Sequence, residues 1–170
     1  MSLSKLMLIL TLSAVTLRAD DDPYFAALLA DINLHRQRAG APAVTLNGPL
    51  MKLAGEWAEK NAAAGQMIHR KNLQVIVSGL GYSYLNENLY LAKNPDGSPP
   101  APRRVVTAWM NSAGHRHNLL KDRVDQIGIG IARAADGAYH VVFNGADSHP
   151  PKPGMPAGVR FNGAPLNKAN

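Results

Sequence analysis

The order of apolar and polar residues predicts two helices in the first third of the chain. Residues 21–40 and 47–65 repeat apolar side chains at intervals of three and four, the period of an amphipathic helix. These positions are Phe25, Leu28, Leu29 and Ile32, then Leu50, Leu53, Ala54, Trp57 and Ala58. A polar N-cap candidate and a proline open each helix, and Gly40 and Gly65 close them. Asn33 and Arg36, near the end of the first helix, are interpreted as solvated side chains.

A third helical pattern runs through residues 105–112. Its apolar positions, which we expect to pack inward, are Val105, Val106, Trp109 and Met110. Ser112 and Gly114 are poor residues for a helix interior, so the helix is predicted to end around them. This end would present His115 at a turn, where a side chain can point into a cleft.

The remaining patterned segments predict mainly strands. Residues 70–81 fit either a short helix or a buried strand, and we favour the helix. Residues 83–91 alternate as a strand does, and residues 127–132 and 139–143 form a hairpin around a turn at 135–138. Gly128 and Gly130 would let another segment approach one face of the hairpin closely. They lie within a strand and no helix follows, so they do not form a nucleotide-binding loop.

Glu87 is the unusual residue of the strand at 83–91. One face carries Leu85, Glu87, Leu89 and Leu91, and the other carries Tyr84, Asn86, Asn88 and Tyr90. A carboxylate among leucines must be exposed, paired with a cation, or shifted in pKa. The simplest alternative is an edge position with the carboxylate in water.

The chain of 170 residues predicts one domain with three segments. Residues 1–19 resemble a secretory signal, with Lys5, an apolar run over 6–17 and a small residue, Ala19, at the expected cut. An uncleaved N-terminal anchor is the alternative. Residues 20–146 form the folded domain, and residues 147–170 are a tail rich in proline and glycine. The chain has no cysteine, so its stability must come from packing.

The charge of the chain argues against nucleic acid as a partner. Lysine and arginine total 18 against 12 acidic residues, a net charge of +6. Removing Lys5 and Arg18 with the signal leaves 16 basic and 12 acidic residues, a net charge of +4. The basic residues are scattered, and no aromatic residues are interleaved with them as in single-strand binders. We expect no membrane span in the mature chain, since the apolar run is too short for one.

Six short motifs occur in a fixed order along the chain. They are Asn33-x-x-Arg36-x-x-x-Gly40, Leu50-x-x-x-Ala54-x-x-Trp57-Ala58, Met67-Ile68-His69, Glu87-Asn88, Trp109-Met110-Asn111-Ser112-x-Gly114-His115-Arg116-x-Asn118-Leu119-Leu120 and Ile127-Gly128-Ile129-Gly130-Ile131-Ala132. In order and spacing they resemble the CAP superfamily (SCP domains; cysteine-rich secretory proteins, antigen 5 and pathogenesis-related 1 proteins). The resemblance spans Pro23 to Gly145 and is closest to the cysteine-free bacterial branch.

The resemblance implies an α+β fold, an α-β-α sandwich with a small, mainly antiparallel sheet between helical layers and a cleft on one face. Carried over residue by residue, it places His69, Glu87, Asn88, Ser112 and His115 in that cleft. The family motif normally reads Gly-Glu-Asn, and in this chain Asn86 takes the place of its glycine. The second glutamate of many eukaryotic members would fall near Ser112, so that carboxylate is missing.

Two functions compete for this site. The resemblance favours a secreted or periplasmic, non-catalytic domain that binds a lipid, a sterol or a protein partner. No cofactor is expected to be required, although His69 and His115 suit a divalent metal such as Zn²⁺, with Glu87 as a ligand or beside a bound water. His117 is not expected to join them, because residues two apart on a helix do not share a face. The alternative is a metal-dependent hydrolase, a peptidase with Glu87 as general base.

A third hypothesis is a structural role at the cell envelope. In that case the tail from Asp147 would be the contact segment, and the cleft would have no function. Truncation at Ser148 separates this hypothesis from the others, because envelope association that persists without the tail removes its support.

Overall fold

The computed structural model describes residues 22–149. In chain order its elements are α1 (Pro23–Arg38), β1 (Thr45–Leu46), α2 (Gly48–Ala64), α3 (Leu73–Leu80), β2 (Tyr84–Ala92), α4 (Pro102–Asn111), α5 (Ala113–Leu119), β3 (Gln126–Arg133) and β4 (Tyr139–Asp147). The predicted signal at 1–19 lies outside the described residues, as does the tail beyond His149. None of the helices within 22–149 is long and apolar enough to cross a lipid bilayer.

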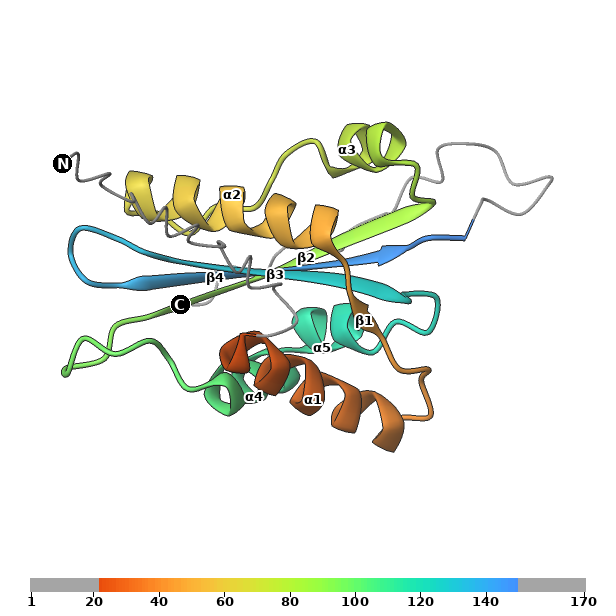
Figure 1. Ribbon diagram of the computed structural model, residues 1–170, viewed down its shortest axis with the longest axis horizontal. Coiled ribbons are helices and arrows are strands. Elements are labelled where there is room, and N and C mark those ends of the chain that lie inside the picture. Colours follow the sequence, from red (N-terminus) through yellow and green to blue (C-terminus); the bar gives the residue numbers. More distant parts are fainter. Residues whose placement is uncertain (1–21, 150–170) are drawn as a thin grey trace, which may run out of the picture.

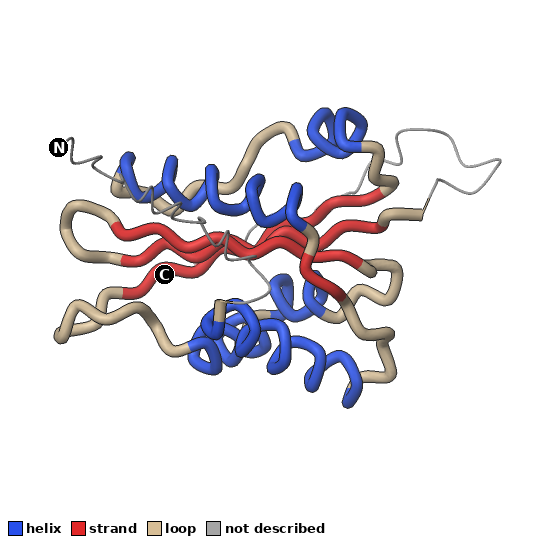
Figure 2. The backbone as a smooth tube through the Cα atoms, in the orientation of Figure 1, coloured by secondary structure: helices blue, strands red, loops and turns tan. Residues whose placement is uncertain are grey.

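Four strands form one sheet in the order β1-β3-β4-β2. The β3–β4 hairpin and the β2–β4 pair are antiparallel, whereas β1 pairs with β3 in parallel. Figure 1 shows α2 and α3 on one face of this sheet and α1, α4 and α5 on the other, and Figure 2 shows the same three layers. The predicted α+β sandwich with a mainly antiparallel sheet is therefore confirmed. β1 was not predicted, because two residues are too few to show alternation.

The helix boundaries follow the predicted capping residues. The Asp22 side chain accepts a hydrogen bond from the Tyr24 N–H, and the Asn47 side chain accepts one from the Leu50 N–H, as N-caps do. Gly65 ends α2 in the left-handed conformation with φ 62°. Residues 73–80 are helical, which confirms the choice of helix over strand for this segment.

α2 lies directly on the sheet because β3 carries glycine where the two meet. A Cβ added to Gly128 would lie 2.0 Å from the carbonyl carbon of Leu50, and one added to Gly130 would lie 2.3 Å from that of Ala54. Real Cβ atoms do not approach backbone this closely, so only glycine permits the contact. The prediction that another segment approaches this face is confirmed, and that segment is α2.

The opposite face of the sheet holds the larger part of the core. The predicted inward face of α4 is confirmed, since Val105, Val106 and Trp109 are fully buried. They pack in one cluster with residues of α1 and with Phe143 of β4. The indole N–H of Trp109 donates to the carbonyl of Leu89 at 3.0 Å, which satisfies a polar group of the edge strand β2.

Arg36 and Asn33 are not solvated, so this interpretation was wrong. Arg36 is 0% exposed and donates to the carbonyls of Pro42, Leu119, Lys121 and Val124 at 2.6 to 3.0 Å. Asn33 exchanges two hydrogen bonds with the backbone of Val44, at 2.8 and 3.0 Å. Backbone groups in the loops after α1 and α5 have no hydrogen-bond partners in a helix or sheet, and these two side chains supply such partners.

β4 is longer than predicted. It was expected to end at Phe143, but it pairs with β2 as far as Asp147. Asp147 was assigned to the tail, yet it is 7% exposed and bonded to Arg123 at 2.9 Å. The apolar pattern stops at Phe143 because the next positions pack through asparagine, glycine and alanine, which give no strand signal.

His140 of β4 is expected to make the fold less stable in mild acid. It is 3% exposed, and its Nδ1 has no hydrogen-bond partner. Burial lowers the pKa of His140, and nearby Asp136 opposes this only in part. The unfolded chain therefore binds this proton more readily than the native chain, and stability is lost as pH falls from about 6.5 towards the lower native pKa.

Denaturant unfolding at pH 7.5 and 5.5 tests this expectation. The free energy of unfolding should be lower at pH 5.5, and the difference should shrink in His140→Leu. The control is His117→Leu, because His117 is exposed. An equal pH effect in wild type and His140→Leu would contradict the assignment.

Candidate functional site

Glu87 lies in the edge strand β2 and faces α2. Its neighbours on the same face, Leu85 and Leu89, pack against α2, which confirms the predicted alternation. The side chain of Glu87 is only 1% exposed. The edge position is therefore correct, but the alternative of a carboxylate in water is wrong.

The carboxylate of Glu87 faces the segment that precedes α3. Its Oε1 lies 3.0 Å from Nδ1 of His69 and accepts the backbone N–H of Arg70, also at 3.0 Å. Its Oε2 lies 3.5 Å from Nε of Arg70 and has no other partner among the described residues. A buried carboxylate needs such compensation, and Arg70 supplies the cation.

Arg70 was missed by the sequence analysis. Its side chain is 7% exposed, lies over the ring of Trp57 at 4.8 Å and donates to the carbonyl of Leu53 at 2.8 Å. Burial lowers the pKa of Arg70, while Glu87 and Glu56 oppose the shift. The indole of Trp57 also donates to the carbonyl of Ile68 at 2.9 Å. α2 thus holds the His69–Arg70 segment through Trp57.

Asparagines on the other face of β2 attach α5 to the edge of the sheet. Asn88 is fully buried and donates to the carbonyl of His115 at 3.0 Å. Asn118 donates to Oδ1 of Asn88 at 2.8 Å and to the carbonyl of Glu87 at 3.1 Å. Asn86, which replaces the expected glycine, donates to the carbonyl of Asn118 at 3.1 Å. These bonds fix where α5 begins and ends.

His115 is on a helix and not at a turn, so that expectation was wrong. Ser112 has extended backbone angles and ends α4, and a second helix, α5, begins at once with Ala113 and includes Gly114. The carbonyl of Ser112 accepts the Arg116 N–H at 2.8 Å, but its side chain caps neither helix. The sequence signal was correct for the break, and it could not show that a new helix follows.

The two histidines lie within range of each other's charge. Burial lowers the pKa of His115, and the charge of His69 lowers it further. Both effects favour the neutral imidazole of His115, which is the form that binds metals. His117 is exposed on the same helix.

Comparison with known proteins decides the family. Residues 29–144, which are 116 of the 170 residues, match the family described as CAP, the cysteine-rich secretory protein family. The chain belongs to the CAP family. The absence of cysteine agrees with the predicted cysteine-free branch.

One curated protein and two solved structures illustrate the relatives of this CAP domain. YkwD of Bacillus subtilis is 30% identical over 106 residues, which are 60% of this chain and 40% of YkwD. An outer surface protein of Borrelia burgdorferi has a TM-score of 0.64 at 20% identity, over 75% of this chain and 95% of that one. NaASP2, solved with Zn²⁺, has a TM-score of 0.57 at 14% identity, over 72% and 78% of the two chains. The similarity to these two solved structures shows the fold of this chain.

In this CAP domain Glu87 supports His69 and is not the atom that a metal would reach first. Because a carboxylate only accepts hydrogen bonds, His69 must donate from Nδ1 to Glu87, which leaves its Nε2 as the free ligand atom. Glu87 then orients His69 and does not itself ligate. Consistently, the ligand atoms of His69, Glu87 and His115 do not all lie within 4.8 Å of one another; within residues 22–149 only Asp125, Asp147 and His149 reach that spacing.

Proposed function

We propose that this chain is an exported, non-catalytic CAP-domain protein that binds its ligand at His69 and His115, with a divalent metal such as Zn²⁺ held between the two imidazoles. The pairing of His69 with Glu87 at 3.0 Å is the observation that carries the proposal. That pairing fixes the tautomer of His69, and the lowered pKa of His115 supplies a second neutral imidazole. NaASP2 is described with Zn²⁺, which makes this ion the first probe.

The residues next to this site favour an apolar ligand. Met67 and Ile68 immediately precede His69 and are 49% and 43% exposed. Exposed apolar side chains beside polar groups are common at ligand and partner sites. A lipid or sterol, or the apolar patch of a protein partner, would cover them.

Export places the protein in the periplasm or outside the cell. The segment at 1–19 has the charge and apolar run of a secretory signal. The structural relative from Borrelia burgdorferi is described as an outer surface protein. Both features support an envelope or extracellular location for this chain.

The geometry of Glu87 disfavours the hydrolase alternative. A general base must reach the water whose proton it takes. The Glu87 side chain is 1% exposed, and both of its oxygens face donors of His69 and Arg70. Position 112 is a serine, so it supplies no second carboxylate for this role.

Calorimetric titration with Zn²⁺ tests the proposal. We expect the chain from Asp20 to Asn170 to bind Zn²⁺ at the imidazole pair, and the His69→Ala/His115→Ala variant to lose that equivalent. Affinity should weaken at pH 5.5, because protons compete for the imidazoles. His117→Ala serves as the matched control, since it removes an exposed histidine of the same helix.

Circular dichroism should show that the double variant is folded before the titrations are compared. An unchanged number of bound Zn²⁺ ions in the double variant would contradict the metal at this site. Zinc-dependent peptide hydrolysis that is lost in Glu87→Gln would instead support the hydrolase alternative.

A further inference from the structure

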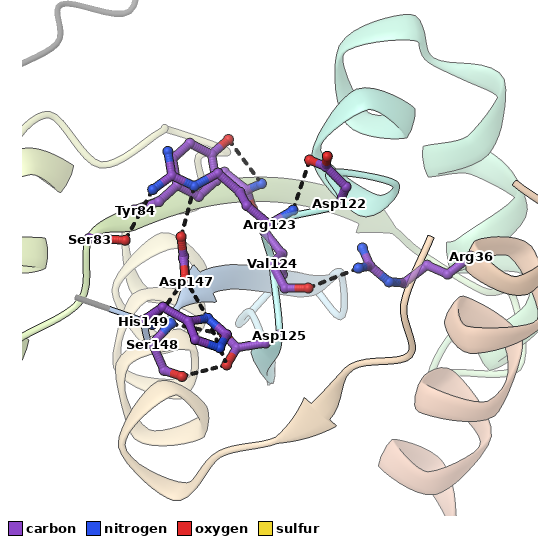
Figure 3. A network of polar contacts seen from close by, with 11 residues as sticks. Arg36, Ser83, Tyr84, Asp122, Arg123, Val124, Asp125, Asp147, Ser148 and His149 are labelled. Carbon is purple, nitrogen blue, oxygen red and sulfur yellow. Dashed lines mark hydrogen bonds and ion pairs between the residues drawn. The ribbon is translucent and has the colours of Figure 1, made fainter. Parts of the chain in front are cut away.

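A second group of metal-ligand residues, which shares no residue with the histidine pair, lies where β2 begins and β4 ends, at the pair formed by Tyr84 and Asp147. Asp125 precedes β3, Asp147 ends β4, and His149 follows two residues later (Figure 3). Gln126 is opposite Ala146 in the antiparallel pair, so the next residues outward, Asp125 and Asp147, are brought together by the strand register. The Asp125 N–H donates to the carbonyl of Ala146 at 3.1 Å, which extends this pairing.

The three ligand atoms have the spacing of a coordination shell. Nδ1 of His149 lies 3.0 Å from Oδ1 of Asp147, to which it donates a hydrogen bond, and 3.8 Å from Oδ2 of Asp125, so a metal ion bound here would replace the Nδ1 proton. Ligand atoms of all three residues lie within 4.8 Å of one another. Neighbouring ligands of an octahedral ion at ~2.1 Å are about 3 Å apart, so small side-chain shifts would bring these three atoms to that spacing.

Surrounding side chains hold both carboxylates in place. Nε of Arg123 donates to Oδ2 of Asp147 at 2.9 Å, which leaves Oδ1 directed at His149. Arg123 is itself held by the Ser83 hydroxyl at 3.0 Å and lies over the ring of Tyr84 at 4.9 Å. Ser148 donates to Asp125 from its backbone N–H at 2.8 Å and from its hydroxyl. Outer partners of this kind orient metal ligands and strengthen their binding.

The charge and exposure of the group suit a bound cation. Among residues 22–149, Arg123 is the one arginine or lysine paired with these two carboxylates, so one negative charge is left over. The Asp147 side chain is 9% exposed, that of Asp125 is 31% exposed and that of His149 is 74% exposed. Burial would raise the pKa of Asp147, but its hydrogen bonds to His149, Arg123 and Ser83 outweigh this and lower it. One side of the group is anionic and fixed, and the other is open to water.

We propose that Asp125, Asp147 and His149 form a second metal site, for a divalent transition-metal ion with water in its remaining positions. One imidazole and two carboxylates favour ions such as Zn²⁺ or Mn²⁺, whereas Ca²⁺ and Mg²⁺ prefer oxygen ligands alone. The ion would join the end of β4 to the loop before β3. This site is independent of the proposed function at His69 and His115.

The test uses Zn²⁺ calorimetry on the full chain from Asp20 in a His69→Ala/His115→Ala background. In that background we expect one remaining equivalent of Zn²⁺. Adding His149→Ala should weaken its binding at least tenfold, since even outer partners of a metal contribute 10- to 100-fold. His149 is exposed, so its loss does not threaten the fold, and His117→Ala in the same background is the matched control.

Asp125→Asn provides a second measurement, because it keeps the size of the side chain and removes the charge. A tenfold or greater loss of Zn²⁺ affinity in this variant supports the site. If the background variant binds no Zn²⁺, or binds it equally well with and without His149 and the Asp125 charge, the group is an ion-pair network only and the proposal is overturned. Wild-type binding that depends on His69 and His115 would survive that result.

Discussion

Replacing Arg36 with methionine is expected to lower the free energy of unfolding by about 3 to 5 kcal/mol, because each buried carbonyl left without a partner costs about 1 to 3 kcal/mol and the desolvation of the guanidinium is recovered. The guanidinium is fully buried and satisfies four backbone carbonyls, one in the loop after α1 and three at the end of α5 and in the loop after it. Methionine fills a similar volume but donates no hydrogen bonds, so these carbonyls would be buried without partners. Chemical denaturation monitored by circular dichroism measures the effect.

Arg38 provides the matched control for this prediction. It lies two residues further along α1 and is exposed. Arg38→Met should change the free energy of unfolding by less than about 0.5 kcal/mol, as surface substitutions do. A similarly small effect in Arg36→Met would show that the four bonds contribute little beyond what water supplies.

The sequence predicted the parts of the fold that depend on local patterns. Caps and closing glycines gave the ends of α1 and α2, and alternation gave the two faces of β2. It failed at Arg36, because Leu119 and Val124, which bond the guanidinium, lie 83 and 88 residues away in the chain. No local pattern distinguishes this arginine from a solvated one.

The candidate site was also predicted only in part from the sequence. The sequence analysis left Glu87 exposed, paired or shifted in pKa, and it did not identify its partner Arg70, which directly follows His69. One group thus contains residues that the resemblance indicated, His69 and Glu87, and a residue that it did not, Arg70. Pairing Glu87 with a fixed cation changes its chemistry, because it becomes a support for His69 and not an available base.

The helix–sheet contact likewise combines a local signal with a distant partner. Alternating glycines in β3 indicated a close approach, and the structure shows that the backbone of α2 makes it. α2 also supports the site, since the ring of its Trp57 lies against Arg70 and the Trp57 indole donates to the carbonyl of Ile68. Displacing α2 should therefore disturb both the core and the position of His69.

Gly130→Ala is expected to destabilise the protein by about 3 kcal/mol or more, at the upper end of the effects of overpacking. The added methyl would lie 2.3 Å from backbone atoms of Ala54 and Gly55, and backbone cannot move aside as a flexible side chain can. Thermal and denaturant unfolding measure the loss. Zn²⁺ affinity at the histidine pair should weaken as well, because α2 positions the segment that carries His69.

Gly55→Ala is the matched control, because it makes the same substitution without a steric conflict. Gly55 lies on α2 at this same contact, yet a Cβ added to it meets nothing within 4 Å. Alanine in a helix interior is favoured over glycine, so this variant should gain about 0.5 to 1 kcal/mol. Opposite signs for the two substitutions would establish that α2 rests on the backbone of β3 at Gly130. A loss of less than about 1 kcal/mol in Gly130→Ala would mean that α2 can move away from the sheet, and the link from this contact to His69 would then be wrong.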